Sequence, residues 1–174
     1  MQTAKIPVSI DPLRTAQSQL DYEGMIPGKQ CKRLNELCAG DCSDVSVSLE
    51  CGVDLQGIVY LKGKAVTELT LTCQRCMRSY NTEVTVEFCF SPCKTQAEID
   101  ELPEAYDPIE CNEIGEIRLH QLIEDELITA IPLIPRHEDD SCHLGSKDVV
   151  VGVIESVQEE RPNPFAMLEK LKSK

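Results

Sequence analysis

The chain has 174 residues, of which 41% are hydrophobic and 27% charged, a composition typical of a folded globular protein. Its net charge is −13, and residues 94–140 carry most of it, with fourteen acidic against three basic residues. Because affinity for nucleic acid depends mainly on cations, this balance excludes a general phosphate binder and restricts any RNA contact to a local patch. No stretch is apolar over the roughly 18 residues that a membrane span needs, so we expect no membrane contact.

The first ninety residues predict two short helices followed by antiparallel strands. An Asp-Pro pair at residues 11–12 marks the start of one helix, and a second is expected over residues 31–38. In residues 44–90 hydrophobic and polar side chains alternate, which is typical of half-buried strands. The connections are too short for parallel crossovers, so we expect an antiparallel meander in which residues 62–64 form a turn or a bulge.

The second half of the chain predicts one long amphipathic helix. Residues 117–131 have a continuous apolar face, and Pro132 ends the pattern. We expect this helix to cover one face of the sheet, with Glu124 and Asp125 on its outer side. Residues 91–111 are acidic and rich in proline, which predicts a loop with little regular structure.

The predicted fold class is therefore α+β, an antiparallel β-meander covered by one main amphipathic helix, with short helices near both termini. Residues 1–144 are expected to form this single domain, with a Cys-x-x-Cys hairpin tip. Residues 145–162 contain glycine, serine and glutamate and predict a flexible acidic linker. An Asn-Pro pair then predicts a short C-terminal helix over residues 163–174.

Ten cysteines is a high number for a chain of this length. No basic start followed by a long apolar run precedes them, so we expect a cytoplasmic protein whose cysteines are mostly free thiols. Six stand alone and are expected to pack as small hydrophobic side chains: Cys31, Cys38, Cys51, Cys89, Cys93 and Cys111.

The strongest chemical signal is the pair Cys73 and Cys76, which lies between two segments that alternate like strands. At a hairpin tip both thiolates could bind one metal ion, but two thiolates alone hold zinc weakly. The segment after the main helix supplies His137 and Cys142, with His143 as an alternative. Together Cys73, Cys76, His137 and Cys142 would form a Cys₃His set, an ordinary composition of structural zinc sites.

Two other interpretations of the Cys-x-x-Cys pair stay open, namely free structural thiols and redox use. A redox pair needs a helix N-terminus at its first cysteine to lower the pKa of that thiol, and here a strand pattern follows Cys76. His120 lies beside the apolar stripe of the main helix and is expected to be structural. The chain has no phosphate-binding glycine loop, no His-Glu-x-x-His and no Gly-x-Ser-x-Gly, so no enzyme is indicated.

A local excess of positive charge surrounds the Cys-x-x-Cys pair. Between residues 60 and 80, Lys62, Lys64, Arg75 and Arg78 are opposed only by Glu68, a net charge of +3. This patch is a candidate contact surface for RNA or a partner protein, and ordinary solvated charge is the alternative.

Several short segments also occur in a specific order along the chain. They are residues 5–7 (Lys-Ile-Pro), 11–16 (Asp-Pro-Leu-Arg-Thr-Ala), 71–76 (Leu-Thr-Cys-Gln-Arg-Cys), 89–92 (Cys-Phe-Ser-Pro), 102–106 (Leu-Pro-Glu-Ala-Tyr), 124–126 (Glu-Asp-Glu) and 163–166 (Asn-Pro-Phe-Ala). No single segment is specific, but their order and spacing resemble the YceD family, the large ribosomal RNA subunit accumulation proteins, and its proteobacterial members most closely.

The resemblance implies a small bacterial cytoplasmic protein without catalytic activity that is needed for the synthesis, processing or stability of 23S rRNA. It implies 23S rRNA or the pre-50S particle as partner, bound directly or through a basic ribosomal protein or assembly factor, with no DNA. Relatives carry further cysteines in the stretch matching residues 137–142, which favours a metal site there. Two alternatives remain, a thiol oxidoreductase that uses Cys73 and Cys76, and an acidic adaptor that binds a basic protein without RNA.

Overall fold

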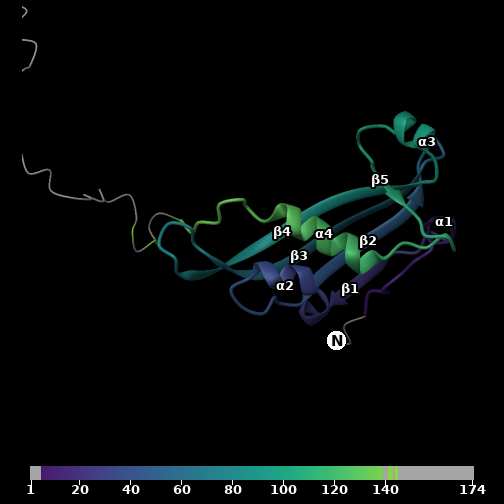
Figure 1. The fold of residues 1–174 in the computed structure, drawn as a ribbon. Helices are drawn as coiled ribbons and strands as arrows, with labels where there is room; N and C mark the ends of the chain where they lie inside the picture. The colour runs from purple at the N-terminus through teal and green to yellow at the C-terminus, as the bar shows by residue number, and fades with distance from the viewer. Residues whose placement is uncertain (1–4, 139–140, 143, 145–174) are drawn as a thin grey trace, which may run out of the picture.

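The computed structural model describes residues 5–138, 141, 142 and 144, which form a five-stranded sheet with α2 and α4 packed in front of it (Figure 1). The strands follow one another across the sheet in the order β1-β2-β3-β4-β5. The predicted α+β class is confirmed. The predicted linker over 145–162 and the helix over 163–174 lie outside the described residues.

The elements of the described part follow the chain in a simple order. The strands are β1 (Tyr22–Ile26), β2 (Val45–Val53), β3 (Val59–Thr72), β4 (Ser79–Cys93) and β5 (Asp107–Glu110). The helices are α1 (Pro12–Gln17), the 3-10 turn η1 (Gly28–Gln30), α2 (Lys32–Leu37), α3 (Gln96–Glu101) and α4 (Leu119–Ala130). None of these described helices is long and apolar enough to cross a membrane.

The sheet is mixed, because β5 pairs with β4 in parallel while β1 to β4 are antiparallel neighbours. The expectation of a purely antiparallel sheet, and of a loop throughout residues 91–111, is therefore wrong at this edge. A parallel pair needs a crossover of about a dozen residues, and residues 94–106 provide it. Part of that crossover is α3. Its N-cap is Thr95, whose hydroxyl accepts the backbone N–H of Glu98.

Strand β3 runs without interruption through the predicted turn at residues 62–64. Gly63 lies in the middle of the strand, paired with Leu49 of β2 and Phe88 of β4. A Cβ atom at this position would lie 2.6 Å from the carbonyl oxygen of Ser48 and 2.7 Å from the Phe88 ring. Glycine here permits close packing inside a strand, not a turn, so the sequence signal was interpreted wrongly.

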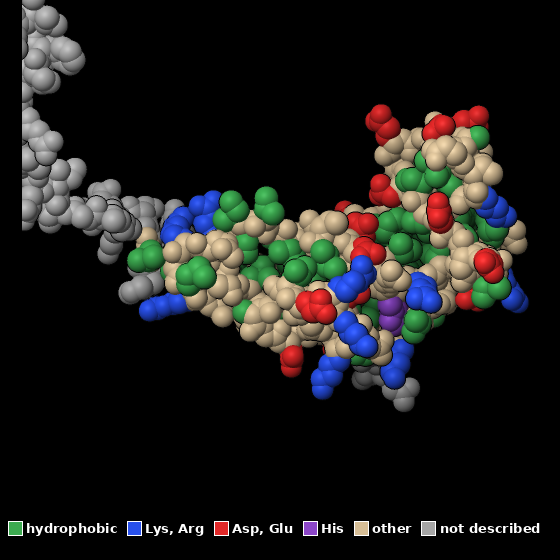
Figure 2. All heavy atoms as spheres, in the orientation of Figure 1, with side chains coloured by type: hydrophobic (Ala, Val, Ile, Leu, Met, Phe, Trp, Pro, Cys, Tyr) green, Lys and Arg blue, Asp and Glu red, His purple; other side chains and the backbone are tan. Residues whose placement is uncertain are grey.

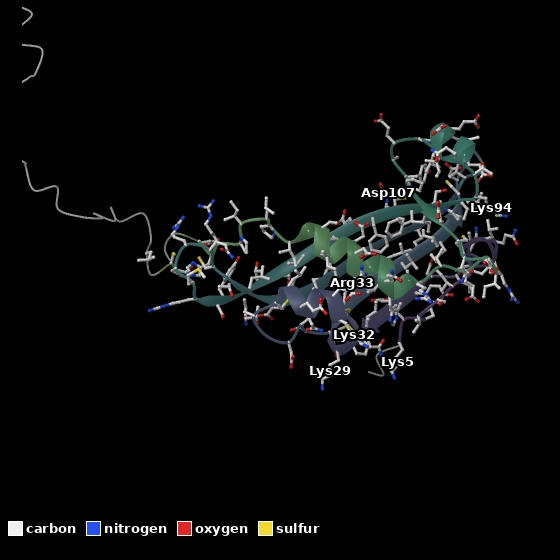
Figure 3. All side chains as sticks on the ribbon, in the orientation of Figure 1. Lys5, Lys29, Lys32, Arg33, Lys94 and Asp107 are labelled. Atoms are coloured by element: carbon white, nitrogen blue, oxygen red, sulfur yellow. The ribbon has the colours of Figure 1, made fainter. Side chains whose placement is uncertain are left out.

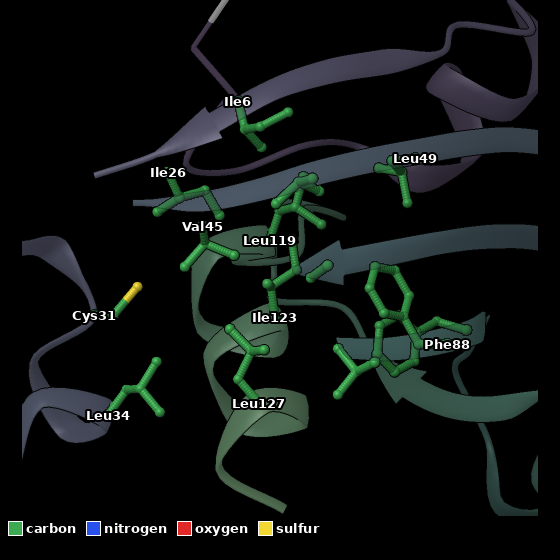
Figure 4. Packing of buried hydrophobic residues seen from close by; sticks show 14 of the residues in the cluster. Ile6, Ile26, Cys31, Leu34, Val45, Leu49, Phe88, Leu119, Ile123 and Leu127 are labelled. Atoms are coloured by element: carbon green, nitrogen blue, oxygen red, sulfur yellow. The ribbon is translucent and has the colours of Figure 1, made fainter. Parts of the chain in front are cut away.

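The core fills the space between the sheet and α4 (Figure 4). Val45, Leu49 and Phe88 face it from the strands, and Leu119 and Ile123 face it from α4. Alternate strand residues and every fourth helix residue thus meet on one layer, as the two periodicities require. Burial of each such side chain contributes about 1.5–3 kcal/mol to folding.

Helix α2 is attached to this layer through Glu124 of α4, which is buried rather than outward as predicted. Its Oε1 accepts the backbone N–H groups of Arg33 and Leu34, at 2.8 and 3.1 Å. These are two of the four N–H groups that a helix leaves unpaired at its N-terminus. Glu124 therefore acts as an N-terminal cap for a helix 91 residues away in the chain.

Candidate metal centre

The β3–β4 hairpin closes in a tight turn that contains the Cys-x-x-Cys pair. Cys73 donates its N–H to the carbonyl of Arg78 at 2.9 Å and accepts the N–H of Met77 at 2.8 Å. Met77 adopts a left-handed backbone conformation, with φ of 58°. This turn places Cys73 and Cys76 at the end of the two longest strands of the sheet.

The segment that follows α4 lies against this turn. Gln74 donates its backbone N–H to the carbonyl of Pro135 at 2.9 Å, which joins the two segments. Three residues later the chain turns again, because the carbonyl of Glu138 accepts the N–H of Cys142 at 3.0 Å. The turn directs His137 and Cys142 towards the hairpin tip.

The ligand atoms of Cys73, Cys76, His137 and Cys142 all lie within 4.8 Å of one another. The Cys76 sulfur is 3.3 Å from Nε2 of His137. A tetrahedral zinc ion with bonds of about 2.3 Å to sulfur and 2.0 Å to nitrogen separates such atoms by roughly 3.5–3.8 Å. The structure thus brings together the four residues grouped from the sequence, and this cluster could hold a metal ion; His143 lies outside the described residues.

His137 is held in place by an aromatic neighbour. The rings of His137 and Tyr80 meet edge to face, with centroids 5.3 Å apart and planes at 74°. Nδ1 of His137 is buried and has no hydrogen-bond partner among the described residues. The other ring nitrogen, Nε2, lies 3.3 Å from the Cys76 sulfur, so it is the nitrogen that a metal ion among the sulfurs would bind.

One sulfur of the cluster, that of Cys73, differs in acidity from the other cysteines. Burial raises the pKa of Cys73, but backbone N–H groups of Cys76, Arg75 and His137 outweigh burial and lower it to about 6. The N–H of Arg78 lowers the pKa of Cys76, while burial and the sulfurs of Cys73 and Cys142 raise it overall. One thiolate is therefore favoured in the cluster, and a thiolate is the form that binds metal.

Comparison with known proteins places these residues in a family. A family model described as large ribosomal RNA subunit accumulation protein YceD matches residues 61–172, which include all four cluster residues. A Haemophilus influenzae protein, also named large ribosomal RNA subunit accumulation protein YceD, is 42% identical over 174 residues, all of this chain and all of that protein. The chain belongs to the YceD family. No solved structure matches it.

The resemblance to the YceD family inferred from the sequence is thus confirmed. The basic patch predicted around the Cys-x-x-Cys pair, by contrast, is divided by the structure. Lys62 and Lys64 lie on β3, and Lys64 pairs with Glu87 at 3.5 Å. Arg75 and Arg78 lie in the hairpin turn beyond Thr72, the last residue of β3. Thr72 is eight residues from Lys64, which is about 26 Å at the rise of a strand. The structure therefore places these four cations in two separate regions.

The isolated cysteines of this YceD-family chain behave as packing residues. Cys31, Cys51 and Cys93 are buried, and burial raises the pKa of both Cys31 and Cys51 to about 12. The remaining three, Cys38, Cys89 and Cys111, are half-buried, and burial raises their pKa values as well. The contrast with Cys73 separates structural thiols from the cluster.

Sequence reasoning missed two residues of the site. Tyr80 orients His137, and its only signal was its place as the first aromatic residue after the cysteines. Met77 adopts the left-handed conformation of the turn and exposes 70% of its surface. Because glycine usually occupies such a position, a methionine there gave no signal.

Proposed function

We propose that this protein is a non-enzymatic cytoplasmic factor of large ribosomal subunit biogenesis that supports the synthesis, processing or stability of 23S rRNA. The match to the Haemophilus influenzae protein carries the proposal, because it extends over the full length of both chains at 42% identity. The partner is 23S rRNA or a pre-50S particle, reached directly or through a basic ribosomal protein or assembly factor.

One large hollow on the sheet shows no sign of catalytic chemistry. This hollow, of about 840 Å³, is lined by five carboxylates and two lysines: Asp21, Glu23, Glu50, Glu87, Asp107, Lys62 and Lys64. Its thiol, Cys89, has a pKa raised by burial, the reverse of an activated nucleophile. Its lining therefore contains no activated thiol.

A second part of the proposal is that Cys73, Cys76, His137 and Cys142 bind one zinc ion. Three cysteines and one histidine fill the four positions of a structural zinc site and leave none for a substrate. The short distance between Cys76 and Nε2 of His137 and the lowered pKa of Cys73 support this assignment. The ion would fasten the segment after α4 to the hairpin tip.

The zinc-fastened tip would then present a contact surface to its partner. Arg78 and Arg136 are exposed there, beside the exposed side chains of Met77 and Leu133. Cations together with apolar surface suit contact with phosphates and unstacked bases. At the opposite end of the sheet, acidic side chains gather over α3, where a basic ribosomal protein or assembly factor would bind (Figure 2).

Complementation of a deletion strain tests the function. We expect the strain to accumulate less 23S than 16S rRNA, and the wild-type protein to restore the ratio measured on RNA gels. A Cys73→Ser/Cys76→Ser variant should restore it poorly, whereas Cys89→Ser should restore it fully. Normal 23S rRNA and normal ribosome profiles in the deletion strain would show that the proposed function is wrong.

Metal analysis of the freshly purified chain tests the zinc site independently of RNA. We expect about one zinc ion per chain, lost in Cys73→Ser and Cys142→Ser and kept in Cys89→Ser, a half-buried thiol outside the cluster. A chelator should lower the melting temperature of the wild type but not of Cys73→Ser. Protein free of metal, with stability unaffected by chelator, would contradict the site.

The lowered pKa of Cys73 is also what a thiol oxidoreductase would show. Cys73 is, however, fully buried, and a turn follows it where a redox pair has a helix. Iodoacetamide labelling distinguishes the two functions, because a redox pair reacts quickly at neutral pH and a zinc-bound pair reacts only after chelation. For the third alternative, the acidic adaptor, partners captured from cells should be unaffected by nuclease.

A further inference from the structure

A hollow of about 460 Å³ lies between α2 and the first turn of α4. Its rim carries hydrogen-bond donors from both helices and from η1: Gln30, Lys32, Arg33, Arg118, His120 and Gln121. The predicted basic patch did not include any of these residues. We infer that this hollow, apart from the hairpin tip, is the main surface through which the protein binds the phosphates of RNA, an inference that rests on the proposed function.

Three chain segments converge at this hollow. Nε2 of His120 is 2.9 Å from the carbonyl oxygen of Ile6, which holds the N-terminal segment and therefore Lys5 beside α4. The backbone of Lys5 also forms an isolated β-bridge with Met25 of β1. Lys29 precedes Gln30 in η1. Lys5, Lys29, Lys32 and Arg33 accordingly gather around α2 and the N-terminal segment (Figure 3).

The two carboxylates nearest the hollow, Glu124 and Asp125, share one cation, Arg33. Arg33 binds Glu124 through Nε and Nη2, at 3.3 and 3.2 Å, and binds Asp125 through Nη1. Glu124 also accepts two backbone N–H groups of α2. One negative charge is left over, which the other cations around the hollow outnumber.

Four cations around the hollow remain available for an anion. Lys5, Lys29, Lys32 and Arg118 are exposed, and none of them forms an ion pair within the part of the chain that the structure describes. Lys64, by contrast, is paired with Glu87, and Lys62 lies opposite Glu50 of β2. The cations around the hollow thus form a locally positive surface on a chain of net charge −13.

The chemistry of the rim favours RNA over an acidic protein. Arginine, lysine and glutamine side chains are the groups that contact phosphate and sugar oxygens in nucleic-acid complexes. The acidic remainder of the chain repels RNA at long range, so binding depends on these few contacts. Each contact to a phosphate releases counterions, so binding weakens steeply as the salt concentration rises. Four phosphate contacts on single-stranded RNA correspond to a salt slope of about −3.

Binding of purified 23S rRNA to the full-length protein, measured by filter retention at several salt concentrations, tests this surface. We expect the charge-reversal variant Lys5→Glu/Lys29→Glu/Lys32→Glu/Arg118→Glu to bind at least about tenfold more weakly and to lose most of the salt slope. The matched variant Lys62→Glu/Lys64→Glu changes two equally exposed lysines on the sheet and should bind within about twofold of the wild type. Melting temperature and metal content verify that each variant folds.

Three results would overturn the inference: a wild type that does not retain 23S rRNA at low salt, equal weakening in both variants, or binding of polyglutamate in place of RNA. The same variants in the deletion strain separate this inference from the proposed function. If the four-residue variant restores 23S rRNA while the empty vector does not, the function stands and this surface is wrong. If the deletion strain has normal 23S rRNA, the proposed function fails whatever the binding data show.

Discussion

Arg33 and Glu124 are joined twice, once through the backbone N–H of Arg33 and once through its guanidinium. The first contact caps α2, and the second balances a carboxylate whose side chain is only 10% exposed. This one residue pair therefore holds α2 against α4 and borders the basic hollow.

Glu124→Ala should lower the free energy of unfolding by about 2 kcal/mol, because it removes a helix cap and a half-buried ion pair together. Urea denaturation followed by circular dichroism measures this change. Asp125→Ala is the matched control, since it removes the other, more exposed partner of Arg33 and should cost less than about 1 kcal/mol. Equal losses in the two variants would contradict a capping role for Glu124.

Gly63→Ala should destabilise the sheet by about 1–3 kcal/mol, the usual range for overpacking. The new methyl group would collide with the Ser48 carbonyl and the Phe88 ring, and the backbone oxygen cannot move aside. Gly40→Ala provides the comparison, because its Cβ would meet Thr70 at an ordinary 3.8 Å. A Gly63→Ala protein as stable as Gly40→Ala would mean that the strands separate more easily than their packing indicates.

Met77→Gly should raise the free energy of unfolding by about 0.5–1 kcal/mol. Glycine adopts the left-handed conformation of this turn without the cost of about 1–2 kcal/mol that a side chain carries, and part of that gain is lost to the more flexible unfolded chain. Met77→Ala retains a Cβ and should show no such gain. The two variants can be compared by thermal melting with metal content held equal.

The stability of the protein should fall above pH 9, because Cys31 and Cys51 stay protonated in the fold, with pKa values of about 12, and ionise near pH 9 when it unfolds. Each buried thiol then contributes a loss of up to about 1.4 kcal/mol between pH 8 and pH 10. Cys51→Ala should lose less stability over this interval than the wild type. Ser48→Ala, which removes no titrating group, should retain the full dependence, and identical profiles for the Cys51→Ala and Ser48→Ala variants would count against this explanation.

Local patterns made the hairpin and its cysteines predictable. Alternation on both sides of Cys73 and Cys76 is determined by which face of each strand is buried, and that information lies within a few residues. The grouping with His137 and Cys142 needed only the further assumption that the chain folds back after a helix ended by Pro132. These features required no knowledge of distant contacts.

The features that sequence reasoning missed depend on contacts between distant segments. Gly63 resembles a turn residue, and only its neighbours on β2 and β4 show that it fills a place too narrow for a side chain. Glu124 resembles a solvated residue until α2 is placed against it. The basic hollow combines Lys29, Lys32 and Arg33, which a count over residues 29–33 would have found, with Lys5 and Arg118 from distant segments, which only the fold brings near.

The lengths of the strands also determine how the sheet meets other molecules. Its edges are β1 and β5, of five and four residues, while the strands of fourteen and fifteen residues lie inside it. Pro108 in β5 lacks an N–H group, and Asp107 and Glu110 beside it repel an approaching acidic chain. The two edge strands themselves therefore offer few unpaired backbone groups to another strand, whereas residues 79–89 of β4 extend beyond β5 and have no strand partner on that side among the described residues.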